Sequence, residues 1–157
     1  MTQISCMSMT RDAALQAFPL IRAVYPCMSL EQWQKRLSFL VDNGCHNGAI
    51  VALRCGYVRG VFTFALAPAG EDATRLEIRD LCIMDMLEGD DVLMALIECM
   101  KDKIRDLKAS DSVVYLAPEQ KNEARTLRRE GLQTHTLCGA ALYEEPSSKL
   151  TDKIVIG

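Results

Sequence analysis

Cysteine and histidine are the residue types in this sequence with the widest chemical range, because they can act as nucleophiles, bases and metal ligands. The chain has seven cysteines but only two histidines, His46 and His135. His46 directly follows Cys45, and adjacent residues in a loop seldom supply two ligands of one tetrahedral site. Cysteine pairs of the CxxC type are also missing. The sequence therefore predicts no metal site.

A cysteine nucleophile would need one of the two histidines as its base. His135 and Cys138 are three residues apart, so a regular strand would direct them to opposite faces. Cysteine catalysis is therefore disfavoured. The odd number and irregular spacing of the cysteines, several of them among apolar neighbours, instead indicate free thiols in a reducing compartment.

Arginine side chains form a basic patch in a predicted helix, at Arg125, Arg128 and Arg129. Such a patch could contact the phosphate of a cofactor or of a nucleic acid. Glu123 and Glu130 are interleaved with it, which is more typical of a solvated helix face. The formal net charge of −3 gives no general attraction to polyanions. We therefore predict no nucleic-acid partner and no membrane partner.

The turn Glu88-Gly89-Asp90-Asp91 precedes the longest apolar-periodic segment and has the position of a ligand-binding turn. Its acidic side chains carry the wrong charge to hold a phosphate. Acids in a first helical turn also stabilise the helix, by roughly 0.3–1 kcal/mol each, without any ligand. Basic side chains at the far end of the same helix, Lys101, Lys103, Arg105 and Lys108, complement the helix dipole in the same way.

These residues belong to a chain of 157 residues, which is the size of one domain spanning 1–157. Its 49% hydrophobic and 25% charged residues are ordinary globular values. The first residues lack the basic start and apolar run of a signal peptide, and no apolar stretch approaches the roughly 20 residues of a membrane span. We predict a cytoplasmic protein.

Periodicity and turn residues predict the elements in turn. A strand at 3–9 precedes a helix that Thr10 caps and that runs to Val24. After Pro26, Ser29 and Gln32 form a capping box for a second helix, which ends before Gly44. Next come a hairpin (49–54 and 57–66), a strand (74–84), the long helix (90–108), a strand (112–117), a helix (121–130) and strands at 132–138 and 153–156. On the strand 74–84, alternation places Leu76 and Ile78 on one face and Leu81 and Ile83 on the other.

This order of elements resembles the GNAT acyltransferases, an α/β fold with a mixed, mostly antiparallel sheet. The resemblance covers nearly the whole chain and is mostly architectural. Its recognisable points are Leu81-Cys82-Ile83 before the long helix, Glu130-Gly131-Leu132 where the family often has Gly-Phe, Gly139-Ala140-Ala141-Leu142-Tyr143, and Asp152-Lys153-Ile154-Val155-Ile156.

The resemblance implies an acetyl-CoA or other acyl-CoA cofactor, with the pantetheine arm held by backbone groups of Cys82, Ile83 and Met84. The family binds the pyrophosphate through a turn of pattern Gln/Arg-x-x-Gly-x-Gly/Ala, which here falls on Glu88, Gly89, Asp90, Asp91, Val92 and Leu93. Glu88 replaces the expected base, while Asp91 and Leu93 replace small residues. Like charges at about 5 Å repel by roughly 3 kcal/mol before screening, and the Leu93 side chain would obstruct backbone approach. The resemblance thus implies impaired CoA binding.

The resemblance also implies catalytic groups. The family often protonates the departing thiolate with a Tyr four residues before the glycine of Gly-Phe, a position held here by Leu127. Tyr115 and Tyr143 are substitutes, although each is more simply explained as a strand residue with a buried ring and its hydroxyl at the rim. A base is needed for the amine, and Glu77 is the best-placed carboxylate, ahead of Asp80. Pairing of Glu77 with Arg75 or Arg79 explains it equally well.

Two functional hypotheses follow from the resemblance. The first is an acyltransferase that moves an acyl group from acyl-CoA to a small-molecule or peptide amine, with a homodimer among its allowed assemblies. The second is a non-catalytic binding or scaffold module that keeps the fold for its packing surface. The degenerate turn favours the second hypothesis, whereas the prevalence of enzymes in the family favours the first.

Overall fold

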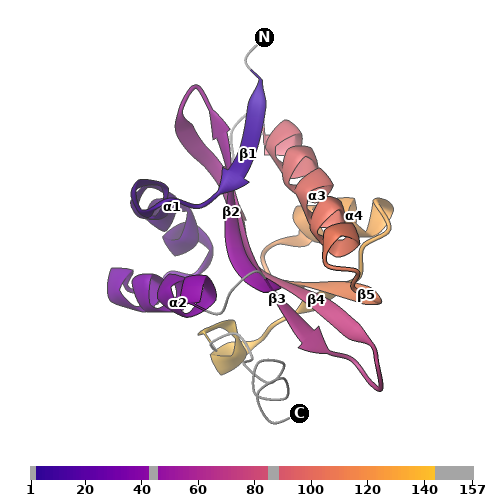
Figure 1. The fold of residues 1–157 in the computed structure, drawn as a ribbon. Coiled ribbons are helices and arrows are strands. Elements are labelled where there is room, and N and C mark those ends of the chain that lie inside the picture. The colour runs from indigo at the N-terminus through magenta and orange to yellow at the C-terminus, as the bar shows by residue number, and fades with distance from the viewer. Residues whose placement is uncertain (1–2, 43–45, 85–88, 144–157) are drawn as a thin grey trace.

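The computed structural model describes residues 3–42, 46–84 and 89–143 (Figure 1). Its strands form one six-stranded sheet in chain order. The strands are β1 (Ile4–Ser8), β2 (Asn47–Arg54), β3 (Tyr57–Pro68), β4 (Thr74–Ile83), β5 (Asp111–Leu116) and β6 (Thr134–Thr136). Pairing is antiparallel from β1 to β4 and parallel from β4 to β6. The predicted mixed, mostly antiparallel α/β fold is confirmed, and the strand expected at 153–156 lies outside the described residues.

Within the described residues, four α-helices flank this sheet: α1 (Arg11–Val24), α2 (Leu30–Asp42), α3 (Gly89–Asp106) and α4 (Lys121–Arg129). In Figure 1, α1 and α2 lie on one side of the sheet, and α3 and α4 on the other. A short 3-10 helix, η2 (Gly139–Tyr143), follows β6. The predicted helix boundaries thus hold to within about two residues, which is the usual scatter at helix ends.

The first two helices begin where side-chain caps satisfy backbone groups that the helix leaves without partners. Thr10 Oγ1 accepts a hydrogen bond from Ala13 N at 3.2 Å. At α2, Ser29 N donates to Gln32 Oε1 at 2.8 Å, and Gln32 N donates to Ser29 Oγ at 3.1 Å. Both predicted caps are therefore confirmed, the second as a reciprocal capping box.

The apolar residues form two clusters, one on each face of the sheet. On the α3 and α4 face, the cluster includes Phe62, Leu76, Ile78, Leu81, Leu96, Ile97, Met100 and Leu127. On the α1 and α2 face, the cluster includes Leu20, Ile21, Tyr25, Trp33, Val51, Val61 and Cys82. The sheet is therefore covered by apolar packing on both sides, which is why β2 and β3 read as nearly continuous apolar runs.

A β-bulge interrupts β4 at Asp80. Cys82 pairs with Val61 and Arg79 pairs with Thr63, so Asp80 and Leu81 together face one residue of β3. Asp80 has a φ of 57°, in the left-handed region that Asp tolerates better than most residues.

The bulge corrects the alternation predicted for β4. Leu81 belongs to the same cluster as Leu76 and Ile78, and Ile83 packs against that cluster. The prediction that Leu81 and Ile83 lie on the opposite face from Leu76 and Ile78 is therefore wrong, because the extra residue shifts the period of two by one position.

Close packing of α3 on the sheet depends on Gly60 of β3. A Cβ at this position would lie 2.8 Å from both Leu96 Cδ1 and Val92 Cγ1 of α3, closer than carbon atoms normally approach. Glycine thus allows the first turns of α3 to lie directly against the strands.

The longest of the described helices is α3, at 18 residues, and its exposed face is polar. Among the described residues, no helix is long and apolar enough to cross a membrane.

Candidate functional site

The parallel pairing of β4 with β5 ends before either strand does. The paired residues run from Arg75 with Asp111 to Ile78 with Val114. Beyond that point the side chain of Gln120 connects the two segments, because its Nε2 donates to Leu81 O at 2.6 Å and its Oε1 accepts from Ala117 N at 2.9 Å. Gln120 is buried, so its amide satisfies two interior backbone groups that the ladder leaves without partners.

The bulge itself is held by a buried ion pair. Arg36 Nη1 of α2 lies 2.7 Å from Asp80 Oδ1, and the two side chains are 5% and 2% exposed. Thr63 Oγ1 donates to the other carboxylate oxygen, Oδ2, also at 2.7 Å. Asp80 is thus enclosed by structural partners on both oxygens. The secondary expectation that Asp80 is a catalytic base is not supported, because no substrate could reach this carboxylate.

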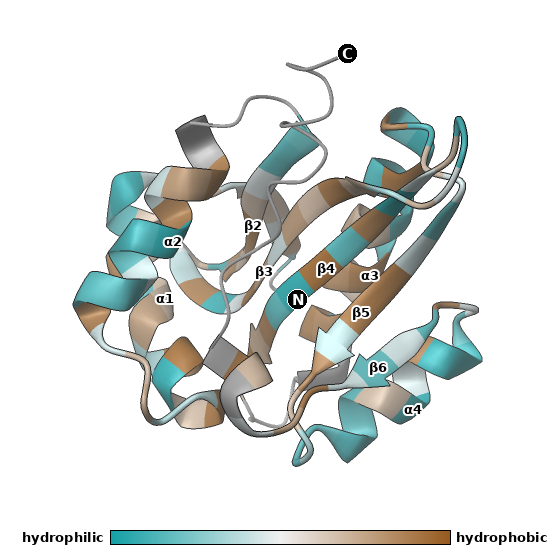
Figure 2. Ribbon diagram, turned by 90° about the horizontal axis from the view of Figure 1, so that it is seen from below, coloured by the Kyte–Doolittle hydropathy of each residue, from teal (hydrophilic) through white to brown (hydrophobic). Residues whose placement is uncertain are grey.

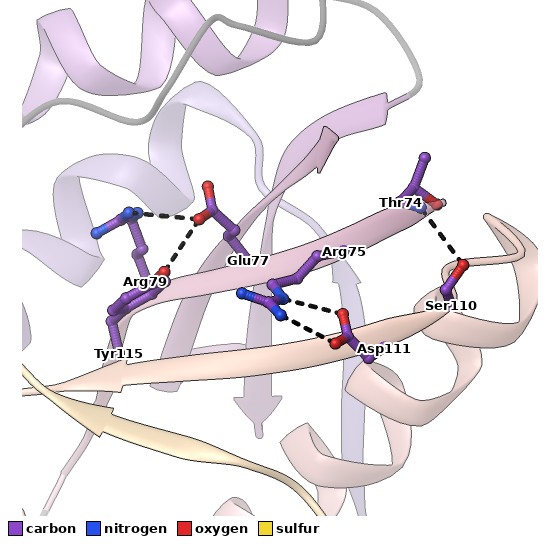
Figure 3. Close-up of polar contacts among 7 residues, drawn as sticks. All are labelled: Thr74, Arg75, Glu77, Arg79, Ser110, Asp111 and Tyr115. Carbon is purple, nitrogen blue, oxygen red and sulfur yellow. Dashed lines mark hydrogen bonds and ion pairs between the residues drawn. The ribbon is translucent and has the colours of Figure 1, made fainter. Parts of the chain in front are cut away.

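Glu77 lies on β4, on the face opposite to Leu76 and Ile78. Its side chain is 13% exposed. Tyr115 of β5 donates its hydroxyl hydrogen to Glu77 Oε2 at 3.0 Å, and Arg79 Nη2 lies 3.9 Å from the same oxygen (Figure 3). The other oxygen, Oε1, is buried without a hydrogen-bond partner among the described residues. Glu77 is therefore an anchored carboxylate that retains one oxygen for a further donor.

Aromatic and cationic contacts complete this group of side chains. The Arg79 guanidinium carbon lies 4.0 Å from the centre of the Tyr115 ring, in a cation–π contact. The ring of His135 on β6 meets Tyr115 edge-on, with centroids 5.6 Å apart. Burial, and then the charge and hydrogen bond of Glu77, raise the pKa of Tyr115 above its usual value. Tyr115 therefore stays a neutral hydrogen-bond donor at physiological pH.

The alternative partner expected for Glu77 makes a different contact. Arg75 forms a two-pronged ion pair with Asp111 of β5, at 2.9 and 3.0 Å (Figure 3). This hydrogen bond lowers the pKa of Asp111. Of the two arginines considered for Glu77, only Arg79 is close to it.

The three residues expected to hold the pantetheine arm differ in exposure. Cys82 is fully buried, and burial, with the nearby charges of Asp80 and Glu123, raises the pKa of its thiol. Ile83 is partly buried. Met84 N donates to Arg59 O at 2.9 Å, and Met84 Sδ accepts from Arg59 Nη1 at 2.9 Å. The side chain of Cys82 is therefore closed to a ligand, and the expected contact through its backbone stays a prediction.

The start of α3 is the expected pyrophosphate position. Asp91 projects into solvent with 76% of its side chain exposed, and Arg54 Nη2 of β2 lies 4.0 Å from its carboxylate. Glu88 lies outside the described residues, and Gly89 and Asp90 form the first residues of the helix. One of the predicted acids therefore lies in the first turn of α3, with a cation from β2 beside it.

The next two residues of the expected motif belong to the core. Val92 and Leu93 are 3% and 2% exposed and pack in the cluster beneath α3. The expectation that the Leu93 side chain obstructs the backbone at this turn is wrong, because the helix periodicity directs it inward. Its side chain contributes packing rather than a barrier to a ligand.

The other candidate catalytic residues lie in different parts of the structure. Leu127, at the position where the family often has its tyrosine acid, is fully buried in the core. Tyr143 ends the 3-10 helix η2 rather than lying in the expected strand, and its catalytic role stays a prediction. His135 and Cys138 are both exposed, and Cys138 lies beyond the end of β6. Across the described ranges, no three His, Cys, Asp or Glu side chains gather as metal ligands would.

Two hollows among the described residues bear on the site. One, of about 340 Å³, lies between α1 and β3 and includes Met84 in its wall. The other, of about 970 Å³, lies between α1, α2 and the start of β2 and includes Phe64 and Lys103. Glu77 lines neither of these two hollows, so they do not point to the anchored carboxylate.

Two residues of the site, Gln120 and Arg54, were not predicted from the sequence. Gln120 follows Pro118 and precedes a helix, where it reads as an ordinary loop residue, and only the end of the β4–β5 ladder reveals its function. Arg54 ends a predicted hairpin strand, and its position beside Asp91 depends on tertiary packing. A signal existed for the bulge, because the apolar residues of β4 change parity between Ile78 and Leu81. Figure 2 shows the alternating polar and apolar bands of this strand.

Comparison with known proteins identifies the architecture. No curated protein and no protein-family model matches the sequence. Many solved structures match the fold. An aminoglycoside N-acetyltransferase in complex with CoA is 10% identical, with a TM-score of 0.73, over 88% of this chain and 94% of that one.

Two further structures give the same result. Glucosamine-6-phosphate N-acetyltransferase from Arabidopsis thaliana is 11% identical, with a TM-score of 0.68, over 88% of this chain and 97% of its own. Ribosomal-protein-alanine N-acetyltransferase from Brucella melitensis biovar Abortus 2308 is 16% identical, with a TM-score of 0.65, over 87% and 95%. At such identities the similarity concerns the fold.

Proposed function

We propose that this chain, which has the fold of the GNAT N-acetyltransferases, transfers an acyl group from an acyl-CoA to an amine. The observation that carries the proposal is Glu77, a largely buried carboxylate with one oxygen anchored by Tyr115 and the other without a partner among the described residues. This arrangement suits a base, because the anchored oxygen fixes the orientation of the carboxyl group and the other oxygen can accept a proton.

The chemistry requires a neutral amine nitrogen. Glu77 Oε1 would take a proton from the attacking amine, directly or through a water molecule, as the nitrogen bonds to the thioester carbonyl carbon. The carbon–sulfur bond then breaks, and CoA leaves as a thiolate that must acquire a proton. Tyr143 is our candidate donor for that proton. A small molecule or a peptide amine is the proposed acceptor, consistent with two of the compared enzymes, which are named for an aminoglycoside and for a ribosomal-protein alanine.

We propose weak and atypical CoA binding. Backbone groups of Cys82, Ile83 and Met84 would contact the pantetheine arm, and the start of α3 would face the pyrophosphate. The helix terminus and Arg54 favour an anion there, whereas the exposed Asp91 carboxylate opposes it. Because Asp91 is mostly exposed, solvent screens much of this repulsion. The residues present therefore fit CoA in part.

A second function, a non-catalytic binding module, is favoured by Gln120. Its amide already occupies Leu81 O and Ala117 N, the backbone groups at the end of the β4–β5 ladder. A chain that no longer accepts a ligand there would benefit from such an internal partner. The two functions differ in whether CoA binds at all.

Calorimetry with acetyl-CoA and with free CoA separates the two proposals. We expect dissociation constants between about 10 µM and 1 mM, and absence of binding at millimolar concentration would overturn the acyltransferase proposal. Asp91→Asn should tighten binding by roughly two- to tenfold, because it removes one screened like charge. Asp106→Asn, at the other end of α3, is the matched control and should leave binding unchanged.

Transfer itself is tested by mass spectrometry of a panel of amines incubated with acetyl-CoA. Glu77→Gln should lower the rate by about 10²-fold or more, since loss of a general base commonly costs that much, while CoA affinity stays the same. Glu119→Gln, which removes an exposed carboxylate, is the control. Equal rates in the Glu77→Gln variant and the unmodified chain would show that Glu77 is not the base.

A further inference from the structure

Two cysteine thiols from distant parts of the chain meet where β1 packs along α3 (Figure 1). Cys6 of β1 and Cys99 of α3 are both partly buried against the core cluster on that face. Cys6 Sγ lies 3.7 Å from the carbonyl oxygen of Ala95, one helical turn before Cys99. Ala95 and Cys99 are four residues apart and lie on the same face of α3, so the two thiol side chains are neighbours, and each shifts the pKa of the other.

Electrostatics distinguish the two sulfurs. Interaction with the Cys6 thiol lowers the pKa of Cys99, opposed by partial burial and by the charge of Asp102. Lys103, one turn further along α3, lowers it again, and Glu98 raises it slightly. The same interaction, together with burial, raises the pKa of Cys6. Cys99 is therefore the thiol that more readily becomes a nucleophilic thiolate.

We propose that Cys6 and Cys99 form a reversible intramolecular disulfide when the folded protein meets a low-molecular-weight disulfide such as oxidised glutathione. The Cys99 thiolate attacks one sulfur of the reagent, forms a mixed disulfide and releases one glutathione thiolate, which takes up a proton. Cys6 then loses its proton and attacks the Cys99 sulfur, releasing the second glutathione. Two protein thiols are oxidised, and one glutathione disulfide is reduced to two thiols.

Such a bond would covalently join the first strand to the longest of the described helices. It would close a loop of about 90 residues, which restricts the unfolded chain strongly and predicts an increase in melting temperature of roughly 5–15 °C. The other described cysteines differ in setting: Cys82 is fully buried, whereas Cys27, Cys55 and Cys138 are exposed.

The test treats the reduced full-length chain with oxidised glutathione under native conditions. Free thiols are then alkylated in denaturant and the products are mapped by mass spectrometry. We expect loss of two titratable thiols without a retained glutathione on either, and one cross-linked peptide pair containing Cys6 and Cys99. Reduction with dithiothreitol should restore both thiols and the lower melting temperature.

Variants locate the bond. Cys6→Ser should trap a glutathione on Cys99, because the resolving thiol is gone, whereas Cys138→Ser should form the Cys6–Cys99 bond as the unmodified chain does. The proposal is overturned if Cys6 and Cys99 stay reduced, if each carries its own glutathione, or if they become linked only after unfolding in urea.

Discussion

The buried ion pair between Arg36 and Asp80 leads to a quantitative prediction about stability. The change is Asp80→Asn, which keeps the shape of the side chain and the tolerance of Asn for a positive φ. It removes only the negative charge next to Arg36. The backbone at the bulge should therefore stay as it is, and the loss of stability should report on electrostatics.

The magnitude follows from distance and burial. Arg36 Nη1 and Asp80 Oδ1 are 2.7 Å apart, so two unit charges attract by about 6 kcal/mol at an effective dielectric of 20. Desolvation of both ions offsets much of this attraction in the intact protein. Removal of one charge leaves the desolvation cost of the other without compensation, so we expect a loss of about 3–5 kcal/mol. For a chain of this size the melting temperature should fall by roughly 6–20 °C.

The assay is urea denaturation followed by circular dichroism, with the free energy of unfolding extrapolated to water. Arg75 and Asp111 are the matched control, because they form an ion pair at a similar distance, 2.9 Å, with side chains 42% and 37% exposed. Asp111→Asn should change the free energy of unfolding by an amount near the uncertainty of the fit, because exposed pairs contribute little.

A double variant completes the experiment. Arg36→Met combined with Asp80→Asn should be more stable than Asp80→Asn alone, because it no longer buries a charge without its carboxylate. Equal losses from Asp80→Asn and Asp111→Asn would refute the argument, as would a double variant that is less stable than either single variant. In that case the bulge would depend on shape and not on the buried charge.

Three further outcomes are expected. Gln120→Leu should lower the free energy of unfolding by about 2–5 kcal/mol, because it leaves two buried backbone groups without partners; a loss below ~1 kcal/mol in urea denaturation would show that water replaces the amide. Gly60→Ala should cost about 1–3 kcal/mol by the same measurement, since its Cβ would crowd α3, and Val92→Ala in the same chain should recover part of that loss. In an ultraviolet absorbance titration, Tyr115 should ionise above the ordinary tyrosine pKa of about 10, because its pKa is raised. Its contribution to stability is complete below pH ~10 and falls as the pH rises through its folded-state pKa. A tyrosine ionisation at or below pH 10 that disappears in Tyr115→Phe would contradict this prediction.

Much of the fold was predictable because, along most of the chain, the capping residues and the apolar periodicity of the sequence agree with the tertiary packing. The Thr10 cap and the Ser29–Gln32 capping box are local chemistry, and both form as predicted. The apolar stripe of the long helix predicts the buried face of α3, which includes Leu96 and Met100. Where pattern and packing point the same way, a sequence specifies its elements closely.

The errors came from places where tertiary structure overrides a local rule. Alternation along β4 fails because Asp80 is an extra residue in the strand. Leu93 was expected to obstruct the turn, whereas its side chain packs in the core beneath α3.

The candidate site was less predictable than the fold. The sequence supplied Glu77 as a base and Tyr115 as an alternative acid. It could not show that the two side chains hydrogen-bond to each other, because residues on neighbouring parallel strands meet only once the register of the sheet is set. The proximity of Cys6 and Cys99 could not be predicted for the same reason, because the packing of a strand on a helix brings these two residues together.

The β4 bulge also bears on how this strand can change by insertion or deletion. The apolar residues before and after Asp80 lie on one face only because of the extra residue. Deletion of Asp80 would therefore leave every side chain of the strand facing as it does now and give a regular ladder with β3. What a shortened chain would lose is the carboxylate that joins β4 to Arg36 of α2. The bulge is thus dispensable for the pattern of the sheet, and its persistence or loss among descendants of this chain would indicate whether that link is needed.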